Sequence, residues 1–390
     1  MSAIPTLHLP GVPPGARVVV AMSGGVDSSL AAALVVRAGY EAVGVTLQLY
    51  DHGAATGRPG TCCAGRDIRD ARRVADHLAI PHYVLDFEAR FRRAVIDDFV
   101  DTYLAGRTPV PCVRCNQRIK FRDLLEVARG LGAAALVTGH YVRRVEGPEG
   151  PELHVAADPR KDQSWFLFAT TREQLAFCHF PLGGLTKDET RRIAAVLGLP
   201  TARKAESQDI CFVPDGDHVR LVERLRPDAA TPGEIVHVEE GRVLGRHGGI
   251  HRYTVGQRRG LGVATGERLY VVAIDARRHR VLVGPRRATL TRALIMEAVN
   301  WLAGPPPPER RIEARHRHNE PAVPARVEPA DDGRVRVVFE APESGVAPGQ
   351  ACVLYEGTRV LGGGWIAAVE PAGGKAGSAP TGGTPAVAQP

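Results

Sequence analysis

The sequence predicts an α/β protein in which a parallel-sheet domain is followed by two small β-rich domains. In the first half of the chain, short apolar runs alternate with helix-like segments. This alternation favours βαβ units and a parallel sheet covered on both faces. After about Cys211 the texture changes, and short runs rich in glycine, valine and arginine dominate. Short strands at such spacing favour small β-barrels or sandwiches.

The apolar pattern places the elements of the first half. Ser29–Ala38 is rich in alanine and leucine and is stopped by Gly39, and Cys63–Leu78 carries its apolar residues close to a helical stripe. Thr186-Lys187-Asp188-Glu189 has the form of a capping box and predicts a helix that runs to about Leu197. We expect strands at Arg17–Met22, Glu41–Leu49, His82–Phe87 and Ala133–Thr138, and further helices at Glu88–Leu104 and Phe121–Leu131.

The second half is expected to form two modules of short strands. A break near Leu290–Ala303, followed by Pro305–Pro308, should separate them. From Pro371 onward the chain holds Gly, Ala, Pro, Ser and Thr with one charge, which is typical of a disordered tail. The predicted domains are therefore residues 1–217, 218–290 and 291–370, with a tail over 371–390. The expected strands are Glu234–Val238, Arg268–Ile274, Arg280–Val283, Arg334–Phe339 and Cys352–Tyr355.

Composition excludes a small disulfide-stapled module and a membrane-spanning chain. The 390 residues are enough for two or three domains that each bury a core. The seven cysteines are odd in number and irregularly spaced, which fits a reducing compartment. No apolar run approaches ~18 residues, and Met1–Gly15 does not resemble a signal peptide. We therefore expect a cytoplasmic protein with no membrane partner.

The basic charge is carried almost entirely by arginine. The net charge is +7, and 45 of the 50 basic residues are arginine. Arginine binds phosphate as a planar fork, so a polyanionic partner fits this composition, although an arginine-rich proteome would produce the same ratio. Two basic patches, His247–Arg259 and Arg310–His318, lie in the β-rich half. They would suit sequence-independent phosphate contacts, or else are ordinary solvated faces.

Ser23–Ser29, with the sequence SGGVDSS, lies between an expected strand and an expected helix. Paired glycines let the backbone aim several N–H groups at one point, and the helix N-terminus adds a positive dipole end. The loop lacks the Gly-Lys-Ser/Thr ending of a Walker A loop. We therefore expect it to hold a pyrophosphate leaving group while chemistry occurs at the α-phosphorus, with Asp27 as a candidate for magnesium contact. An ordinary glycine turn capped by Ser28 or Asp27 is the plainer alternative.

This heptamer resembles the SGGxDS motif of the N-type ATP pyrophosphatases, which adenylate a carbonyl oxygen and then displace AMP with a nucleophile. The resemblance implies ATP and Mg²⁺ as cofactors, bound at the carboxyl edge of a parallel sheet, where ligands bind in open sheets. The ATP contacts it implies are Ala21, Met22, Ser23, Gly24, Gly25, Val26, Asp27 and Ser28, together with Leu47 near the end of the second strand and Gly139 after the fourth.

Two cysteine segments, Pro109–Phe121 and Ser207–Phe212, lie in or beside expected loops. Cys115, in the first, has three cations close in sequence, and neighbouring cations lower a thiol pKa. A nucleophilic thiolate is therefore expected at Cys115, whereas activation of Cys211 would have to come from tertiary neighbours. The cations near Cys115 are Arg114, Arg118 and Lys120. Cys178 and Cys352 lie in apolar surroundings and are expected to pack in cores, while Cys62 and Cys63 fit either a surface or a core position.

Both cysteine segments resemble the tRNA-specific 2-thiouridylase family, as do Gly139–Arg144 (GHYVRR), Lys161–Ser164 (KDQS) and Tyr253–Gly262 (YTVGQRRGLG). The likeness runs from Arg17 to about Ile366. It implies ATP-dependent 2-thiolation of the wobble uridine (U34) of tRNA, through adenylation of the C2 carbonyl oxygen and sulfur transfer from a cysteine persulfide. The implied partners are tRNA and an upstream persulfide donor protein.

The resemblance also implies roles for individual residues. Cys115 would be the nucleophile and Cys211 the persulfide carrier. The tRNA contacts it implies are Val110, Pro111, Cys112, His140, Lys161, Asp162, Gln163, Arg315, His316, Arg317 and Gln350.

One departure from the family pattern concerns Cys112. Many members have an aspartate at this position, proposed to move protons, and a thiol is a different acid or base. Asp209, two residues before Cys211, is a candidate substitute for the aspartate. The departure also creates Cys112-x-x-Cys115, and with Cys211 these thiolates would suit an iron–sulfur cluster. For Cys112 a small buried hydrophobe ranks first, a cluster ligand second and a zinc ligand third, and no resident metal is expected.

Two other functions fit parts of this sequence. An ATP-pyrophosphatase ligase that acts on a small molecule would share the loop but would not need Cys115 or Cys211. An RNA-binding sulfur carrier without catalysis would need the cysteines but would not consume ATP. Replacing each cysteine and measuring ATP consumption with added tRNA separates these functions.

Overall fold

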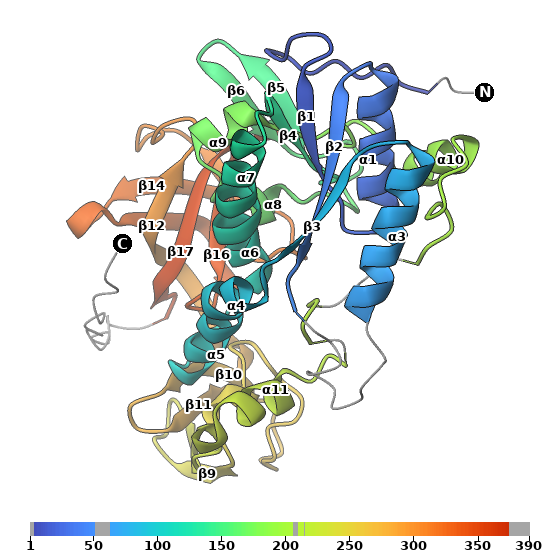
Figure 1. Ribbon diagram of the computed structural model, residues 1–390. Coiled ribbons are helices and arrows are strands. Elements are labelled where there is room, and N and C mark those ends of the chain that lie inside the picture. The colour runs from blue at the N-terminus through green and yellow to red at the C-terminus, as the bar shows by residue number, and fades with distance from the viewer. Residues whose placement is uncertain (1–3, 51–62, 206–209, 214, 374–390) are drawn as a thin grey trace.

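A five-stranded parallel sheet forms the centre of the first domain in the computed structural model, which describes residues 4–50, 63–205, 210–213 and 215–373 (Figure 1). Its order is β3-β2-β1-β4-β7, so the first strand of the chain lies in the middle. Val18 and Val20 of β1 pack on one face and Val19 on the other, and all three are fully buried. The predicted parallel sheet, covered on both faces, is confirmed. Its strands are β1 (Arg17–Ala21), β2 (Glu41–Gln48), β3 (His82–Asp86), β4 (Ala135–Val137) and β7 (Cys178–His179).

Helices cover the two faces of this sheet, with α1 and α3 on one face and the α6–α7 region on the other (Figure 1). α10 packs against α1 and begins at the predicted capping box, where the Thr186 side chain accepts from the Glu189 N–H and the Glu189 side chain accepts from the Thr186 N–H. The helices of this domain are α1 (Val26–Arg37), α3 (Cys63–His77), α4 (Glu88–Phe91), α5 (Asp97–Leu104), α6 (Pro111–Cys115), α7 (Leu124–Gly130), α8 (Ser164–Leu167), α9 (Arg172–Phe177) and α10 (Lys187–Val196).

The helix expected at Phe121–Leu131 begins ten residues earlier, at Pro111. Proline at the first helical position has its φ pre-set and lacks an N–H that would have no partner there. The helix continues from α6 through a π-helical stretch, Asn116–Asp123, into α7. Cys115, expected in or beside a loop, is therefore the last residue of α6.

The two β-rich domains form separate sheets. The central sheet has the order β10-β11-β8-β9, and the C-terminal sheet closes on itself because its first strand, β12, pairs with β17. The central strands are β8 (Gly233–His237), β9 (Val243–His247), β10 (Tyr270–Asp275) and β11 (Arg280–Gly284), preceded by helix α11 (His218–Leu225). The C-terminal strands are β12 (Leu290–Trp301), β13 (Ile312–Arg315), β14 (Val323–Pro329), β15 (Val335–Ser344), β16 (Ala351–Glu356) and β17 (Arg359–Pro371), joined by the β5 (Arg143–Gly147) and β6 (Gly150–His154) hairpin.

The expected break near Leu290–Ala303 is wrong, because most of this stretch is the strand β12. Ala293, Leu294 and Met296 are fully buried in the core of the barrel. The strand makes register shifts with both partners, which breaks the regular alternation that marks a strand in sequence. The tail prediction beyond residue 373, Cys62, Asp209 and the side chain of Cys63 lie outside the described residues.

The barrel packs beside the helix that carries the first cysteine segment. The Thr108 N–H donates to the Pro348 carbonyl at 2.8 Å, and the Arg114 guanidinium lies 3.7 Å from the centroid of the Trp365 ring. Trp165 and Phe168 belong to the shared core. Cys178 and Cys352 are fully buried, as predicted. Within the described ranges, no helix is long and apolar enough to cross a membrane.

Candidate active site

The glycine-rich loop joins β1 to the N-terminus of α1, as predicted. Gly24 has a φ of +72°, and a Cβ there would lie 2.1 Å from the Asp67 carbonyl oxygen of α3. Only glycine combines this conformation with so close an approach. Inside the loop, the Ser23 N–H donates to the Ser28 hydroxyl at 3.1 Å, and the Ser29 hydroxyl donates to the Gly25 carbonyl at 2.7 Å. The loop is thus held in shape by its own serines and backed by α3.

The predicted ATP contacts meet at one edge of the sheet. β2 and β4 flank β1 and run parallel to it, so Leu47, Gly139 and the loop all lie at carboxyl ends. A Cβ on Gly139 would lie 2.8 Å from the Ser28 nitrogen, so glycine is required for this approach. Leu47 is packed against the hydrophobic cluster that contains Cys115. Leu47 therefore joins the end of β2, the strand next to the one that leads into the glycine-rich loop, to the core around Cys115.

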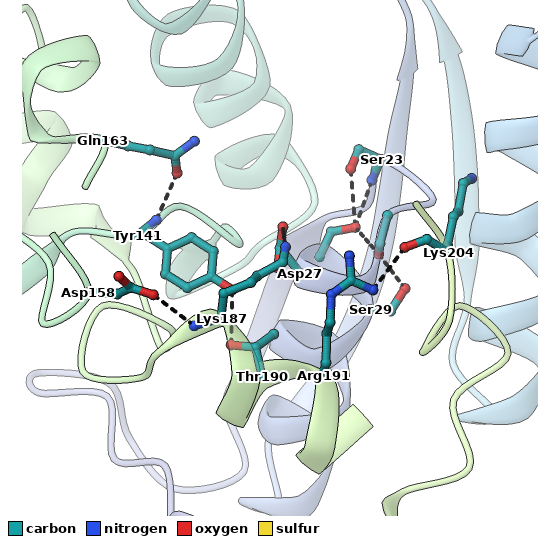
Figure 2. Close-up of polar contacts among 12 residues, drawn as sticks. Ser23, Asp27, Ser29, Tyr141, Asp158, Gln163, Lys187, Thr190, Arg191 and Lys204 are labelled. Carbon is teal, nitrogen blue, oxygen red and sulfur yellow. Dashed lines mark hydrogen bonds and ion pairs between the residues drawn. The ribbon is translucent and has the colours of Figure 1, made fainter. Parts of the chain in front are cut away.

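Asp27, at the start of α1, is held by two side chains that sequence reasoning missed (Figure 2). Lys187, the first residue of α10, places its Nζ 2.7 and 2.8 Å from the two carboxylate oxygens. The Tyr141 hydroxyl donates to Asp27 Oδ1 at 2.8 Å. The Lys187 N–H in turn donates to Asp158 at 3.1 Å. The chain has few lysines, so lysine rarity was a signal that could have drawn attention to Lys187.

Lys204 supplies a second cation to the loop. Its Nζ donates to the Gly24 carbonyl at 3.0 Å and to the carboxylates of Asp67 and Asp70 on α3 at 2.7 and 2.6 Å. The Arg191 side chain of α10 donates to the Lys204 carbonyl at 3.1 Å (Figure 2). Two lysines from the same part of the chain thus hold the loop, although the loop itself contains no lysine.

The structure brings together three cysteines from two segments that lie far apart in the sequence, Cys112 and Cys115 in one and Cys211 in the other. Cys112 and Cys211 are exposed, whereas Cys115 is buried with 8% of its surface exposed. Cys112 and Cys115 act electrostatically on Cys211, almost a hundred residues further along the chain. The thiols of all three are free, so no disulfide joins them in this state. The first-ranked expectation for Cys112, a buried hydrophobe, is wrong because its side chain is exposed.

Burial controls the acidity of the catalytic candidates. It raises the pKa of Cys115 to about 11, which outweighs the opposing effect of Lys120. The groups packed around Cys211 displace water from its thiol, although the residue keeps exposed surface, and with the neighbouring thiols they raise its pKa to about 12; a hydrogen bond with the Tyr50 hydroxyl opposes this rise. In this arrangement both raised pKa values favour the protonated thiol near neutral pH.

The expectation that the cations adjacent in sequence lower the pKa of Cys115 is wrong for Arg114 and Arg118. Arg118 Nη1 lies 2.8 Å and Arg114 Nε 3.5 Å from the Asp98 carboxylate, and the Arg114 guanidinium stacks on Trp365. Helical geometry sends these side chains to other partners. Lys120 is the cation that acts on the thiols, and its Nζ lies 3.5 Å from His140 Nε2.

Some of the predicted tRNA contacts lie at the start of helix α6 or in the barrel turn beside it, and others lie elsewhere with part of their surface exposed. Val110 and Pro111 begin the cysteine helix, and Gln350 lies in the turn of the barrel that packs against Thr108. Gln350 also keeps a buried side-chain oxygen that has no hydrogen-bond partner among the described residues. His140, Lys161 and Gln163 are partly exposed.

Two of the predicted tRNA contacts, Asp162 and Arg315, pair with each other between the first domain and the barrel. The Asp162 carboxylate is buried and accepts from Arg315 at 3.1 Å and from Ser164 at 2.8 Å. His316 is 2% exposed, and this burial is the main reason that its pKa lies below the usual value. Direct tRNA contacts by the side chains of Asp162 and His316 do not fit this burial. Arg317 is partly exposed and donates to Glu320 at 3.2 Å.

In the described part of the chain, Cys112, Cys115 and Cys211 do not lie close enough together to share a single metal ion. Among the described residues, the group of His, Cys, Asp or Glu side chains close enough to share one ion is His237, Glu240 and Glu267 in the central domain. The Glu240 N–H donates to His237 Nδ1 at 3.3 Å, which leaves the ring proton on Nε2. A zinc ion held by Cys112, Cys115 and Cys211 therefore has no support in this geometry.

Comparison with known proteins places the chain among tRNA-modifying enzymes. It matches the models of the tRNA methyl transferase HUP domain over residues 16–215, the tRNA methyl transferase PRC-barrel domain over 221–285 and the aminomethyltransferase beta-barrel domain over 291–366. It is 57% identical over 382 residues to the tRNA-specific 2-thiouridylase MnmA of Parvibaculum lavamentivorans, with 95% of each chain covered. The MnmA of Rhizorhabdus wittichii is 60% identical over 369 residues, with 93% of this chain and 94% of the relative covered. A solved NMN synthetase from Francisella tularensis shows 19% identity and a TM-score of 0.31, over 50% of this chain and 67% of that chain.

Proposed function

The chain belongs to the tRNA-specific 2-thiouridylase family, and we propose that it uses ATP to replace the C2 oxygen of the tRNA wobble uridine (U34) with sulfur. The observation that carries this proposal is that Cys115 and Cys211 lie near each other, and that the core around Cys115 includes Leu47, at the end of the strand next to the one that leads into the glycine-rich loop. A pyrophosphatase loop alone would serve many substrates. Two thiols beside it, recruited from distant segments, suit sulfur transfer.

ATP activates the uridine for substitution. The uridine C2 oxygen attacks the α-phosphorus, pyrophosphate leaves, and the C2 oxygen is then part of an AMP leaving group. The backbone N–H groups of the loop and the α1 N-terminus would hold the departing pyrophosphate. Gly25 fits this role because there is space beside it. The nearest atom to a Cβ added at Gly25 would be the Ser23 hydroxyl oxygen, at 3.6 Å.

Mg²⁺ would accompany the ATP phosphates and neutralise part of their charge. Asp27, the acidic side chain of the loop, has both oxygens within hydrogen-bond distance of Lys187. As arranged, this carboxylate is paired with Lys187 and does not offer a free site for the ion.

Sulfur arrives on Cys211 as a persulfide supplied by a donor protein. In one route the terminal sulfur attacks C2 and AMP leaves, after which Cys115 attacks the Cys211 sulfur and releases the thiouridine. In the other route Cys115 first attacks the Cys211 sulfur and releases sulfide, which then displaces AMP. Both routes leave a Cys115–Cys211 disulfide, which an external dithiol must reduce before the next cycle.

A second candidate for the sulfur step uses an iron–sulfur cluster on the same three cysteines. The exposed Cys112, one helical turn before Cys115, favours this alternative, because a thiol there is open to an incoming group. The overall reaction on tRNA would be the same. Because the substrate is tRNA and the thiols must stay reduced, the cytoplasm is the compartment we propose.

The direct test is nucleoside mass spectrometry of tRNA after incubation with the protein, ATP and a persulfide donor. We expect 2-thiouridine with the parent chain and none with Cys115→Ser or Cys211→Ser. Cys178→Ala, which removes a thiol from the core of the same domain, is the matched control and should retain the product. Thiouridine formed equally well by both serine variants would refute the roles of the two cysteines. ATP consumption that neither tRNA nor the serine substitutions change, with no thiouridine formed, would favour a ligase, and sulfur loading without tRNA-dependent ATP consumption would favour a sulfur carrier.

A further inference from the structure

Cys211 lies in a short turn that is anchored by the ring beside it. The turn spans residues 210–213 and is closed by a hydrogen bond of 2.8 Å from its last N–H to its first carbonyl, so Cys211 and Phe212 are its central residues. Phe212 is 5% exposed, and its ring makes T-shaped contacts with Phe91 and Phe99, with centroids 5.8 and 5.3 Å apart. The turn is thus fixed to a hydrophobic core, while the Cys211 side chain stays exposed.

Tyr50 reaches the same core from another part of the chain. It follows β2, the strand that carries Leu47, and its ring centroid lies 6.0 Å from that of Phe91. Phe91 is fully buried and contacts the rings of both Tyr50 and Phe212. The Tyr50 side chain forms a hydrogen bond with the Cys211 thiol. One buried ring therefore holds both the turn that carries the sulfur and the side chain that contacts it.

Two thiols and two donors act on the Cys211 sulfur. The thiols of Cys112 and Cys115, on α6, raise its pKa, and Lys120 and Tyr50 lower it. Lys120 acts through its charge, which also reaches Cys115, whereas Tyr50 is in hydrogen-bond contact with Cys211. A phenol O–H that donates to sulfur favours the thiolate over the neutral thiol. The Tyr50 contact thus favours the anionic form of one particular cysteine.

A Cys211 thiolate is the form that accepts sulfur. It attacks the outer sulfur of a donor persulfide, a new S–S bond to Cys211 forms, and the donor's own S–S bond breaks. The donor sulfur leaves as a thiolate and the transferred sulfur keeps its proton, so the step needs no oxidant or reductant. The proton that the Cys211 thiol first loses passes to water, because this side chain is exposed. Stabilising the thiolate therefore raises the fraction of protein that is ready to accept sulfur.

We infer that Tyr50 is a further catalytic residue, whose hydroxyl donates a hydrogen bond to the Cys211 sulfur and stabilises the thiolate that accepts sulfur from the donor protein. This inference rests on the proposed function, which makes Cys211 the persulfide carrier. The aromatic core supplies the rigidity that such a contact needs, because Phe91 fixes the Tyr50 ring and Phe212 fixes the turn.

The test is Tyr50→Phe in the full-length protein, which removes the hydroxyl and keeps the ring that contacts Phe91. Alkylation of Cys211 by iodoacetamide is followed by peptide mass spectrometry between about pH 7 and 9, without ATP or tRNA. We expect Cys211 to react about threefold more slowly in the variant. A loss of about one pKa unit of stabilisation gives about tenfold less thiolate, and the greater nucleophilicity of the more basic sulfur offsets part of this. The rate for Cys115, measured in the same sample, should not change.

Tyr103→Phe is the matched control. The Tyr103 ring belongs to the same aromatic core, with its centroid 5.1 Å from that of Phe99, but its hydroxyl forms a hydrogen bond with Thr254. The Cys211 rate of this variant should match that of the parent. An unchanged Cys211 rate in Tyr50→Phe would overturn the inference. A faster rate would also overturn it, because it would show that Tyr50 only shields the thiol.

Two further measurements separate the hydrogen bond from folding and from the proposed function. Placing 3-fluorotyrosine at position 50 keeps the ring and strengthens the donor, so Cys211 alkylation should be faster at neutral pH, and a slower rate would contradict the inference even if Tyr50→Phe does not fold. Sulfur transfer from a small-molecule persulfide to Cys211, read by protein mass, should slow in Tyr50→Phe, and unchanged transfer would refute the catalytic role. Because alkylation needs no turnover, a parent that makes no thiouridine would refute the proposed function separately.

Discussion

Lys187 and Asp27 lie 160 residues apart in the chain and form an ion pair in which Nζ is 2.7 and 2.8 Å from the two carboxylate oxygens. The Lys187 side chain is 7% exposed and that of Asp27 32%. The pair joins the N-terminus of α10 to that of α1, beside the phosphate loop. Removing either partner leaves a charge that is largely hidden from water.

We therefore predict that Lys187→Met lowers the free energy of unfolding by about 2 kcal/mol, the usual size for a lost hydrogen bond to a charged group. Lys187→Met/Asp27→Asn should recover part of this loss, because the unpaired carboxylate is gone. Denaturant unfolding of the two single variants and the double variant measures the coupling. Strictly additive losses would show that the pair does not stabilise the fold.

Neighbouring glycines of the loop should respond differently to substitution. Gly24→Ala should destabilise the protein, because φ is +72° and the added Cβ would meet the Asp67 carbonyl. Gly25→Val should leave stability nearly unchanged. It should weaken ATP binding at least tenfold, because the valine side chain would enter the space expected to hold the phosphates. Binding of tRNA should stay intact. Thermal unfolding and ATP calorimetry on both variants check this contrast. Equal ATP affinity of Gly25→Val and the parent would count against the loop as the ATP site.

The alkylation rate of Cys115 in the free enzyme should depend steeply on pH. Burial raises the pKa of this thiol to about 11, so the reactive thiolate is the minor form at lower pH. The rate should rise about tenfold per pH unit until the pH approaches the pKa. Iodoacetamide labelling read by mass spectrometry of the Cys115 peptide follows this directly. A plateau already at pH 8 would mean that a base or cation lowers this pKa in solution.

The two sulfur-transfer routes differ in their dependence on Cys112. On the persulfide route, Cys112→Ser keeps substantial activity, whereas Cys115→Ser and Cys211→Ser abolish turnover. On the cluster route, all three substitutions are about equally damaging, because each opens a further coordination position. Anaerobic reconstitution with iron and sulfide should then give a charge-transfer band and a gain in activity. We favour the persulfide route, and an inactive Cys112→Ser variant with iron bound to the parent would reverse that preference.

Affinity for tRNA should fall steeply with salt, because phosphate contacts release counterions. Arg258 and Arg259 are exposed in the central domain, and changing each to glutamine should reduce the salt slope by about one. Arg311 is already paired with Glu340 at 2.8 Å, so Arg311→Gln should change the slope less. Filter binding at several salt concentrations compares the three variants. If none of the three variants changes the salt dependence of tRNA affinity, the two β-rich domains must have a role other than phosphate contact.

Local patterns in the sequence determined much of this protein. The apolar runs of β1 and β2, the capping box at Thr186 and the glycine loop are each short-range signals, and the structure confirms them. The strand β12 was missed because its register shifts break the alternation that marks a strand. The motif resemblance identified the family, since motifs are also local.

Tertiary structure alone decided the electrostatics of the site. Sequence proximity placed Arg114 and Arg118 beside the Cys115 thiol, but the helix sends both toward Asp98 and leaves the thiol to burial, which raises its pKa. Lys187 and Lys204 reach the phosphate loop from more than 150 residues away, and no local pattern encodes such a partner. A side chain's charge state depends on the atoms that surround it in space and on the water they exclude, and only the folded chain determines both.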